Sequence, residues 1–285
     1  MKKRYLKQLN ILLEASESIY QEKSGQLADH LAQEGVAVRI VTGKAETVDR
    51  LEAAETLWLT DSAPNAGMLA ASGLLVIAWL HEGNRQSSFG KIRYAVEEPQ
   101  ELAADFFDRI YRRYAEIPWN IAETDRCLIR ETTPEDAEAF ASIYAEPAIT
   151  EYTDPFCMEA HMERQYVKEY IEKVYDFYGY GVWTVVWKET GEVIGRVGFG
   201  QEEIPALGYM IALPWQGRGL AQEVCRAVLD LAKEELGFEE VQAMIHEKNL
   251  ASIRVAEKLG FTSAARSGEA DLEKVRYVLK LCDMC

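Results

Sequence analysis

The sequence predicts two folded units in tandem: an α/β unit built on a parallel sheet, followed by an α+β unit with a mixed sheet. Three observations lead to this prediction. The chain has 285 residues, which is enough for two separate cores. Strand patterns alternate with helix patterns over its first half. In its second half, two strands joined by a short turn precede a strand, a glycine turn and a helix. Pro118, Trp119 and Asn120 form the expected linker, so the units should span residues 1–118 and 119–285.

The first unit alternates between helix and strand signals. In chain order we expect a helix over residues 11–33, strands over 36–41 and 57–60 with a short helix over 46–54 between them, a helix over 64–72, strands over 74–80 and 93–96, and a helix over 101–114. Strands that alternate with helices form a parallel sheet with helices packed on it. The unit should therefore be Rossmann-like, with the strands near residues 36, 57 and 76 as parallel neighbours.

A short acidic motif in this unit leaves a second interpretation open. The sequence Leu-Thr-Asp-Ser-Ala-Pro at residues 59–64, followed by a helix ending in Ala-Ser-Gly at 71–73, faintly resembles the distal half of HAD-like hydrolases. No D-x-D motif precedes it, and Asp61 alone cannot make a phosphoaspartate site with a metal. We therefore expect a non-catalytic module. A phosphate-ester hydrolase or nucleotide binder is the alternative.

Charge and composition limit the classes of molecule that the protein is expected to bind. The formal net charge is −16; residues 1–123 carry 14 basic and 18 acidic residues, and the remaining residues carry 17 and 29. This acidity argues against nucleic acid and favours a cationic substrate. The longest apolar run, residues 74–80, is too short to span a membrane, and polar residues interrupt any signal core. We expect a cytoplasmic protein.

The five cysteines predict neither a disulfide framework nor a metal site. Cys282 and Cys285 form a C-x-x-C at the end of the chain, but no second pair of metal ligands accompanies them. We expect an inert tail and no bound metal. The oligomeric state is left open by the sequence.

The second unit opens with a strand over residues 128–130 and a helix that begins at Thr133-Pro134-Glu135-Asp136. Thr133 is the expected cap, Pro134 suits the first helical position, and the two carboxylates complement the helix dipole. A helical stretch over 159–175 follows, and then two antiparallel strands over 183–187 and 193–199.

The most informative segment runs from residue 207 to residue 261. A strand over 208–211 precedes the turn Gln-Gly-Arg-Gly-Leu-Ala at 216–221, which fits Q-x-x-G-x-A and opens an amphipathic helix. Small residues let a ligand approach the backbone, and the first amides of the helix have no intrahelical partner. The turn is therefore a candidate diphosphate site. A strand over 241–245 follows, then a helix capped by Asn249 and closed by Gly260.

Together these motifs resemble the acetyl-CoA core of the GNAT superfamily of N-acetyltransferases. The motifs are most similar to those of the ribosomal-protein-alanine acetyltransferase subgroup, and the resemblance extends from about residue 125 to the C-terminus. The motifs are Gly-Tyr-Met-Ile, Gln-Gly-Arg-Gly-Leu-Ala, Asn-x-x-Ser and Glu-Lys-Leu-Gly-Phe. The resemblance implies a mixed, splayed sheet. It also implies transfer of an acetyl group from acetyl-CoA to a primary amine, of a small molecule or a protein N-terminus, by direct attack.

The resemblance also implies a set of residues that hold acetyl-CoA through the splayed strand, the turn and the second helix. They are Tyr209, Met210, Ile211, Gln216, Gly217, Arg218, Gly219, Leu220, Ala221, Gln222, Asn249 and Ser252. Among these, the backbone amide of Ile211 should face the thioester oxygen and stabilise the oxyanion. Direct attack requires a neutral amine and a proton for the departing thiolate.

Three positions depart from the family pattern. Ala256 stands where many members carry a tyrosine acid, and Ala206 and Met244 stand at two positions used for a glutamate base. His246 is a candidate substitute, because imidazole exchanges protons near neutral pH. The empty positions also permit an alternative function, an acyl-CoA-binding regulator with little turnover.

Substrate residues are expected between the first two helices of the second unit. Glu151 and Asp154 fall where the family builds its substrate wall. The tyrosines that follow are also candidates for an amine pocket, although core packing is the better expectation for the first three. They are Tyr166, Tyr170, Tyr175, Tyr178 and Tyr180.

Overall fold

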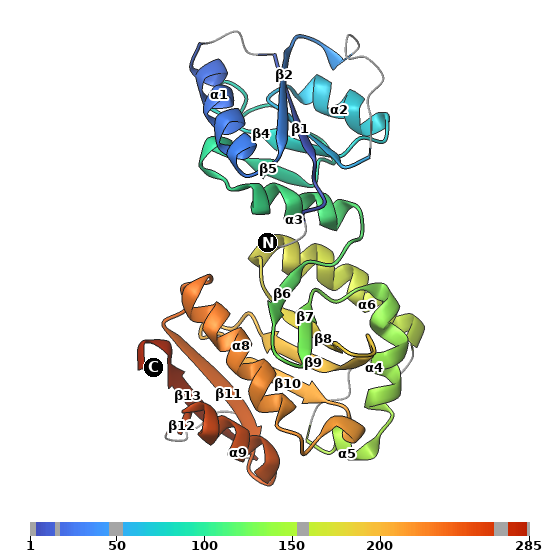
Figure 1. Cartoon of the computed structure of the whole chain (residues 1–285), viewed down its shortest axis with the longest axis vertical. Helices are drawn as coiled ribbons and strands as arrows, with labels where there is room; N and C mark the ends of the chain where they lie inside the picture. The colour runs from blue at the N-terminus through green and yellow to red at the C-terminus, as the bar shows by residue number, and fades with distance from the viewer. Residues whose placement is uncertain (1–3, 15–17, 46–53, 153–159, 265–272, 284–285) are drawn as a thin grey trace. The chain divides into compact units, whose positions relative to one another are not determined.

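The chain divides into two compact units, Met1–Ile117 and Pro118–Cys285. The computed structural model describes residues 4–14, 18–45, 54–152, 160–264 and 273–283 (Figure 1). The short helix expected over residues 46–54 lies almost wholly outside these ranges. The two units are described separately below.

The first unit is a five-stranded sheet with strand order β2-β1-β3-β4-β5, in which every described pairing is parallel. Its strands are β1 (Gln8–Leu13), β2 (Ala37–Thr42), β3 (Thr56–Thr60), β4 (Val76–Trp79) and β5 (Tyr94–Val96). Its helices are α1 (Ser18–Gln33), α2 (Ala63–Ala71) and α3 (Ala104–Tyr114). The strands expected near residues 36, 57 and 76 are thus parallel members of one sheet, but β1 lies between the first two.

The expected helix over residues 11–33 is wrong at its start. Ile11, Leu12 and Leu13 belong to β1 and are fully buried, since β1 pairs with β2 on one side and with β3 on the other. A strand covered on both faces reads as a continuous apolar run, which periodicity alone does not distinguish from a buried helix turn. The helix itself begins at Ser18.

The second unit contains two antiparallel sheets. The larger has strand order β10-β9-β8-β7-β6, with β6 (Asn120–Glu123), β7 (Cys127–Arg130), β8 (Val182–Trp187), β9 (Val193–Phe199) and β10 (Leu207–Ile211). The smaller has order β11-β13-β12, with β11 (Glu240–His246), β12 (Thr262–Ser263) and β13 (Lys274–Lys280). Three of these strands, β6, β12 and β13, carry no clear sequence signal, and β6 begins inside the expected linker.

Helices cover these sheets and connect their strands. They are α4 (Ala137–Tyr144), α5 (Pro147–Thr150), α6 (Ala160–Tyr170), a π-helical turn Ile171–Tyr175, α7 (Asp176–Tyr178), α8 (Leu220–Glu234) and α9 (Leu250–Leu259). Thr133 caps a 3₁₀ turn over Pro134–Asp136 that leads into α4, so the α-helix begins later than expected; the Thr133 amide donates to Asp136 Oδ2 (2.9 Å). Asp136 is buried and also forms an ion pair with Arg130 (2.6 Å) and accepts a hydrogen bond from Thr184 (3.0 Å).

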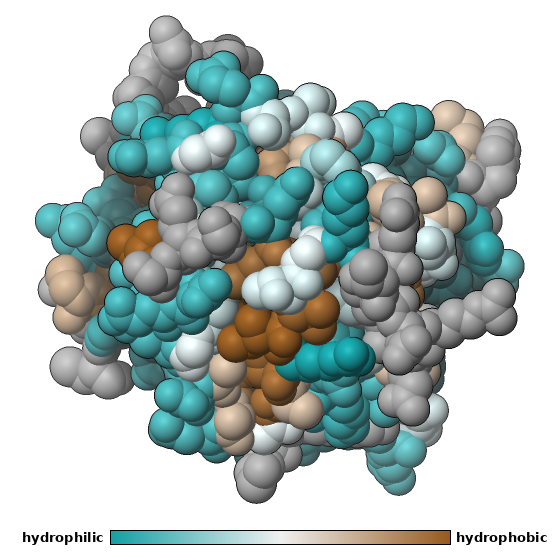
Figure 2. Space-filling view, turned by 90° about the horizontal axis from the view of Figure 1, so that it is seen from above, coloured by the Kyte–Doolittle hydropathy of each residue, from teal (hydrophilic) through white to brown (hydrophobic). Residues whose placement is uncertain are grey.

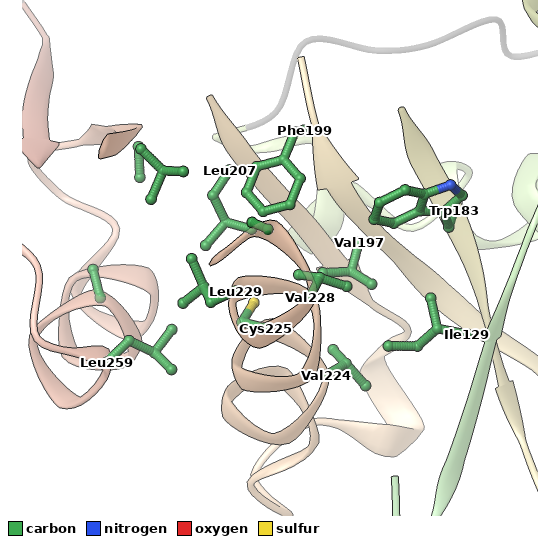
Figure 3. Packing of buried hydrophobic residues seen from close by; sticks show 14 of the residues in the cluster. Ile129, Trp183, Val197, Phe199, Leu207, Val224, Cys225, Val228, Leu229 and Leu259 are labelled. Carbon is green, nitrogen blue, oxygen red and sulfur yellow. The ribbon is translucent and has the colours of Figure 1, made fainter. Parts of the chain in front are cut away.

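The apolar face of α8 forms the centre of the main core. Val224, Cys225, Val228 and Leu229 are fully buried. They face strand residues such as Val197 of the larger sheet, and α9 lies on the other side (Figure 3). This packing fixes the position of the N-terminus of α8, which is where the glycine turn lies.

The two sheets of the second unit meet at one point and then diverge. β10 and β11 are joined in the described structure by a single parallel bridge, Ala206 to Gln242, supported by a hydrogen bond from the Gln242 amide to the Pro205 carbonyl (3.0 Å). Beyond it, β10 pairs only with β9, and β11 only with β13. The result is the splayed arrangement that the sequence motifs predict.

Most of the residues visible on the surface in Figure 2 are hydrophilic. In the view of Figure 2, hydrophilic residues border one central area of hydrophobic residues. Within the described ranges, we find no helix that is both long and apolar enough to cross a membrane.

Candidate functional site

The turn before α8 leaves its backbone exposed to a ligand. Gly217 and Gly219 adopt left-handed conformations, with φ of 73° and 78°, which glycine alone adopts without strain. A Cβ on Gly217 would meet no atom within 4 Å, and one on Gly219 only Arg126 Nη2, at 3.9 Å. The amides of residues 220–222, at the start of α8, have no partner within the helix. The turn therefore has open space beside it and free donors pointing into that space.

Arg126 links this turn to the first turn of α8 through hydrogen bonds. Its Nε donates to Glu223 Oε2 (2.7 Å), its backbone amide to Glu223 Oε1 (3.1 Å), and its Nη1 to the Arg218 carbonyl (3.0 Å). Burial raises the pKa of Glu223, but the hydrogen bonds from Thr124 and Arg126 outweigh it and lower the pKa overall. The carboxylate at the N-terminal end of α8 is thus paired with an arginine that the sequence motifs did not indicate, because it lies 97 residues earlier.

The diverging edge of β10 presents alternate backbone groups. Because the Ala212 amide donates to Ile194 on β9, and the Ala206 carbonyl accepts from Gly200, the even-numbered residues face β9. The amides of Tyr209 and Ile211 therefore face the opening toward β11. The amide of Met210, which is among the residues expected to hold acetyl-CoA, is instead directed to β9. Gln216 Nε2 donates to the Ile211 carbonyl (2.8 Å) and ties the turn to this strand.

A cavity of about 350 Å³ occupies the opening between the two sheets. Its walls come from β10, β11, α6 and α9, and include Tyr209, Met210, His246, Asn249, Ser252 and Ala256. Asn249 caps α9 as expected, because its side chain accepts a hydrogen bond from the Ser252 amide (3.0 Å). The structure thus brings four of the expected residues to one cavity, namely Tyr209, Met210, Asn249 and Ser252, whereas Ile211 and residues 216–222 are not among its lining residues.

Both ring nitrogens of His246 have partners. Nδ1 accepts a hydrogen bond from the Lys248 amide (3.1 Å), so Nε2 carries the proton and donates to Glu273 Oε2 (3.0 Å). The ring also stacks at an angle on Tyr152, with centroids 5.0 Å apart. An imidazole held in this way has no lone pair directed at a substrate.

Two basic side chains in the cavity wall were not anticipated. Arg196, on β9, is 7% exposed, and its guanidinium lies 3.5 Å from the centroid of Phe140 on α4. Lys274, from β13, lines the same cavity. The arginine interrupts the apolar run of β9, which was the available signal for it. The lysine belongs to a strand that the sequence pattern did not indicate.

The expected substrate residues are only partly described. Glu151 follows α5 and is exposed, and it is not among the cavity-lining residues. Asp154 lies outside the described residues. Of the first three tyrosines, Tyr166 and Tyr170 line the cavity, whereas Tyr175 is fully buried and donates to the Val182 carbonyl (2.5 Å).

Asp61 in the first unit is used for structure. Its Oδ1 accepts a hydrogen bond from the Glu14 amide (2.7 Å), and its side chain is 2% exposed. His81 Nε2 lies 3.8 Å from the other carboxylate oxygen. No cluster of three or more histidine, cysteine, aspartate or glutamate residues suited to a metal ion occurs in the part of the chain that the structure describes.

The family-model comparison concerns the second unit. A family model described as an acetyltransferase (GNAT) domain matches residues 126–262. In Bacillus subtilis (strain 168), the uncharacterized protein YkkB is 34% identical over 143 residues, 48% of this chain and 82% of that protein. The uncharacterized N-acetyltransferase YoaA of the same strain is 31% identical over 151 residues, 50% of this chain and 82% of that protein.

Among solved structures, ribosomal-protein-S5-alanine acetyltransferase from Vibrio fischeri is similar with a TM-score of 0.50 at 16% identity. The alignment covers 59% of this chain and 98% of that one. At this identity the likeness concerns the fold.

Proposed function

Because the chain belongs to the GNAT family of acetyltransferases, we propose that residues 119–285 transfer an acetyl group from acetyl-CoA to a primary amine by direct attack. Acetyl-CoA is the acyl donor of this family. The observation that carries the proposal is the opening between β10 and β11, with a glycine turn and a helix N-terminus beside it. A main-chain site of this kind suits a diphosphate joined to a long, narrow arm.

The residues of the opening fit the donor. We assign the diphosphate to the amides of residues 217–222, beside the side chain of Arg218, and the pantetheine arm to the opening that Asn249 and Ser252 border. The amides of Tyr209 and Ile211 face this opening, and that of Ile211 is the candidate to stabilise negative charge on the thioester oxygen. Bound acetyl-CoA supplies the activated acetyl group; the protein supplies position and charge stabilisation.

The nature of the acceptor is inferred from the charged side chains of the cavity. Among the described lining residues, the charged or titratable nitrogen groups are Arg196, Lys274 and His246, and no carboxylate is present. Basic walls favour a carboxylate and disfavour a second ammonium group near the reacting amine. We therefore propose an acceptor whose amine lies close to an anionic group, in place of the cationic acceptor that the overall acidity favours.

Matched pairs of amines test both the proposed acetyl transfer and the proposed class of acceptor. Thiol release from acetyl-CoA would be measured with agmatine against arginine, putrescine against ornithine, tyramine against tyrosine, and a peptide with an N-terminal alanine. The carboxylate-bearing member of each pair should react with the higher kcat/KM. Higher rates for the decarboxylated members would contradict the acceptor class, and no thiol release with any amine would contradict the transferase proposal for this panel.

His246→Gln is expected to leave the shape of the pH profile unchanged. Glutamine can accept from the Lys248 amide and donate to Glu273, so it preserves both contacts of the imidazole. If solvent takes the amine proton, kcat/KM should change by no more than a few-fold and rise with pH in parallel for both proteins. The measurement is kcat/KM against pH with the best amine. A base is active only when deprotonated, so loss of the low-pH limb in the variant would identify His246 as that base.

For the first unit we propose a Rossmann-like, non-catalytic module over residues 1–118. The parallel sheet supports this assignment, and so does the use of Asp61 as an acceptor for a backbone amide. Several apolar side chains of the unit, among them Ile19, Ile40 and Met68, are exposed and available for contacts. The full chain should not hydrolyse a generic phosphate ester with added Mg²⁺; hydrolysis that is lost in Asp61→Asn would favour the hydrolase alternative.

A further inference from the structure

Arg126 lies in the turn between β6 and β7 and reaches from there to the glycine turn before α8. The hairpin turn that carries it is closed by hydrogen bonds from the Thr124 amide to the Cys127 carbonyl (2.9 Å) and from the Cys127 amide to the Thr124 hydroxyl (2.8 Å). The Arg126 carbonyl also accepts from the Lys188 amide, just after β8 (3.0 Å). The backbone from which the guanidinium extends is therefore fixed by its neighbours.

One contact of the guanidinium sets the orientation of a peptide group in the glycine turn. Arg126 Nη1 donates to the Arg218 carbonyl (3.0 Å). That carbonyl and the N–H of Gly219 belong to the same planar trans peptide, in which the two groups point in opposite directions. By holding the carbonyl, Arg126 directs the Gly219 N–H to the opposite side of the turn. A donor that is already oriented costs less to order when a ligand binds.

The other side-chain contacts of Arg126 are with a carboxylate at the same end of α8. Glu223 lies in the first turn of the helix, its side chain is 19% exposed, and its Oε2 pairs with Arg126 Nη2 (2.5 Å). A carboxylate stabilises a helix N-terminus through the helix dipole, but it also repels an anion that binds there. Because the arginine cancels this charge, the positive end of the helix and its unpaired amides remain effective toward a diphosphate.

We propose that Arg126 is a positioning residue for CoA, which acts by orienting the peptide between residues 218 and 219 and by cancelling the charge of Glu223. The inference rests on the assignment of the diphosphate to this turn in the proposed function, and it is independent of which amine is acetylated. Without Arg126, the turn loses an oriented amide and has an uncompensated carboxylate beside it. The affinity for CoA therefore depends on a hairpin that lies 97 residues before the helix.

Other charged or titratable groups lie around Glu223 and stay unchanged in every variant described below. The thiol of Cys127 is one of them, and its pKa is raised by burial and by the charge of Glu223, so it is neutral near pH 7. The others are Lys188 beside the hairpin, Arg218 in the glycine turn and Arg226 one turn further along α8.

The first test is a double-mutant cycle in the affinity for CoA, measured by calorimetry. Arg126→Met should raise the Kd about 30-fold, because the carboxylate is then uncompensated. Arg126→Met combined with Glu223→Gln should return the Kd to within about threefold of the wild type, the remainder reflecting the lost contact with the Arg218 carbonyl. A double variant that binds as weakly as Arg126→Met would overturn the proposal, because a second substitution does not repair a damaged fold.

Two single variants complete the cycle. Glu223→Gln removes the carboxylate and keeps the arginine, so the Kd should not rise; a rise of more than threefold would overturn the proposal, even if Arg126→Met fails to fold. Arg276→Met is the matched control, because this arginine has a similar exposure and pairs with Glu240 (3.9 Å) instead of with the glycine turn. Its Kd should stay within twofold of the wild type, and a 30-fold rise there would show that the loss is not specific to Arg126.

A titration gives a readout that a merely structural role would not move. Burial raises the pKa of Glu223, and hydrogen bonds from Thr124 and Arg126 lower it. Without the arginine the burial remains, so the carboxyl takes up its proton at a higher pH and loses its charge as the pH falls. The Kd of Arg126→Met should therefore approach that of the double variant between about pH 8 and about pH 5. A ratio of the two Kd values that does not change with pH would contradict the role of this charge.

3′-Dephospho-CoA identifies the phosphate on which Arg126 acts. This ligand keeps the diphosphate and lacks the 3′-phosphate, so Arg126→Met should weaken it by the same factor as CoA. Equal affinity of wild type and variant for 3′-dephospho-CoA would place the effect on the 3′-phosphate and overturn the proposal.

The outcomes separate this inference from the proposed function. A wild type that binds no CoA would contradict the assignment of the turn and the proposed function together. A wild type that binds CoA, with Arg126→Met binding equally well, would leave the proposed function standing and overturn this inference alone.

Discussion

Gly219→Asp is expected to reduce the affinity for CoA by roughly ten- to a thousandfold. Gly219 stands at the N-cap of α8, with open space where its Cβ would lie. An aspartate there would place a carboxylate beside the bound diphosphate. Two like charges 4 Å apart repel by about 1 kcal/mol in water and about 4 kcal/mol near a protein surface. Each 1.4 kcal/mol corresponds to about tenfold in Kd, which would be measured by calorimetry.

The matched control is Gly219→Asn, which has the same shape without the charge. Asparagine tolerates a left-handed backbone better than most residues, so the control should fold and lose only a few-fold in affinity. Arg126 Nη2, 3.9 Å from the ideal Cβ, is close enough to pair with the new aspartate and draw it away from Glu223. Undiminished CoA affinity in the aspartate variant would contradict the assignment of the diphosphate to this turn.

Gly195→Ala is expected to lower the stability of the second unit. An ideal Cβ at residue 195 would lie 2.1 Å from the Met210 carbonyl oxygen and 3.1 Å from the Ile211 Cα. Both are backbone atoms, so β9 and β10 must separate. Overpacking of this kind lowers the free energy of unfolding by about 1–3 kcal/mol. Urea unfolding followed by tryptophan fluorescence would measure it.

The displaced strand is the one that carries the Tyr209 and Ile211 amides, so the affinity for CoA should fall together with the stability. Gly208→Ala is the control for stability, because its Cβ would meet no atom within 4 Å and its φ is not positive. It should leave the free energy of unfolding within about 0.5 kcal/mol of the wild type. Equal stability of both variants would show that the contact at Gly195 can relax.

The part of the site that was predictable is the part that depends on local sequence. The glycine turn, the helix that follows it and the Asn249 cap are each specified within a few residues, and the structure has all three as expected. The splay of β10 from β11 was predicted through the family resemblance of these same motifs. The direction of the Met210 amide was missed because it depends on which neighbour β10 pairs with.

The remainder depends on contacts between distant residues. Arg126 reaches Glu223 across 97 positions, and Lys274 enters the cavity on a strand whose pattern is too mixed to read. Packing of the Tyr209 ring against the main core is likewise a property of tertiary structure and is invisible in the sequence. In the first unit, a strand covered on both faces looked like the first turn of a helix. The position of β1 between β2 and β3 was hidden for the same reason.

The single bridge between β10 and β11 also has a consequence for the handling of the protein. Each of these strands is the edge of its own sheet, so in the described structure the backbone groups that they direct toward each other beyond the bridge form no ladder of strand hydrogen bonds. Unpaired strand edges are templates for association with other chains. A ligand that fills the opening covers them, and at a hundred times its Kd it adds about 2.7 kcal/mol to the stability. Storage life and resistance to aggregation should therefore follow the concentration of CoA in the buffer.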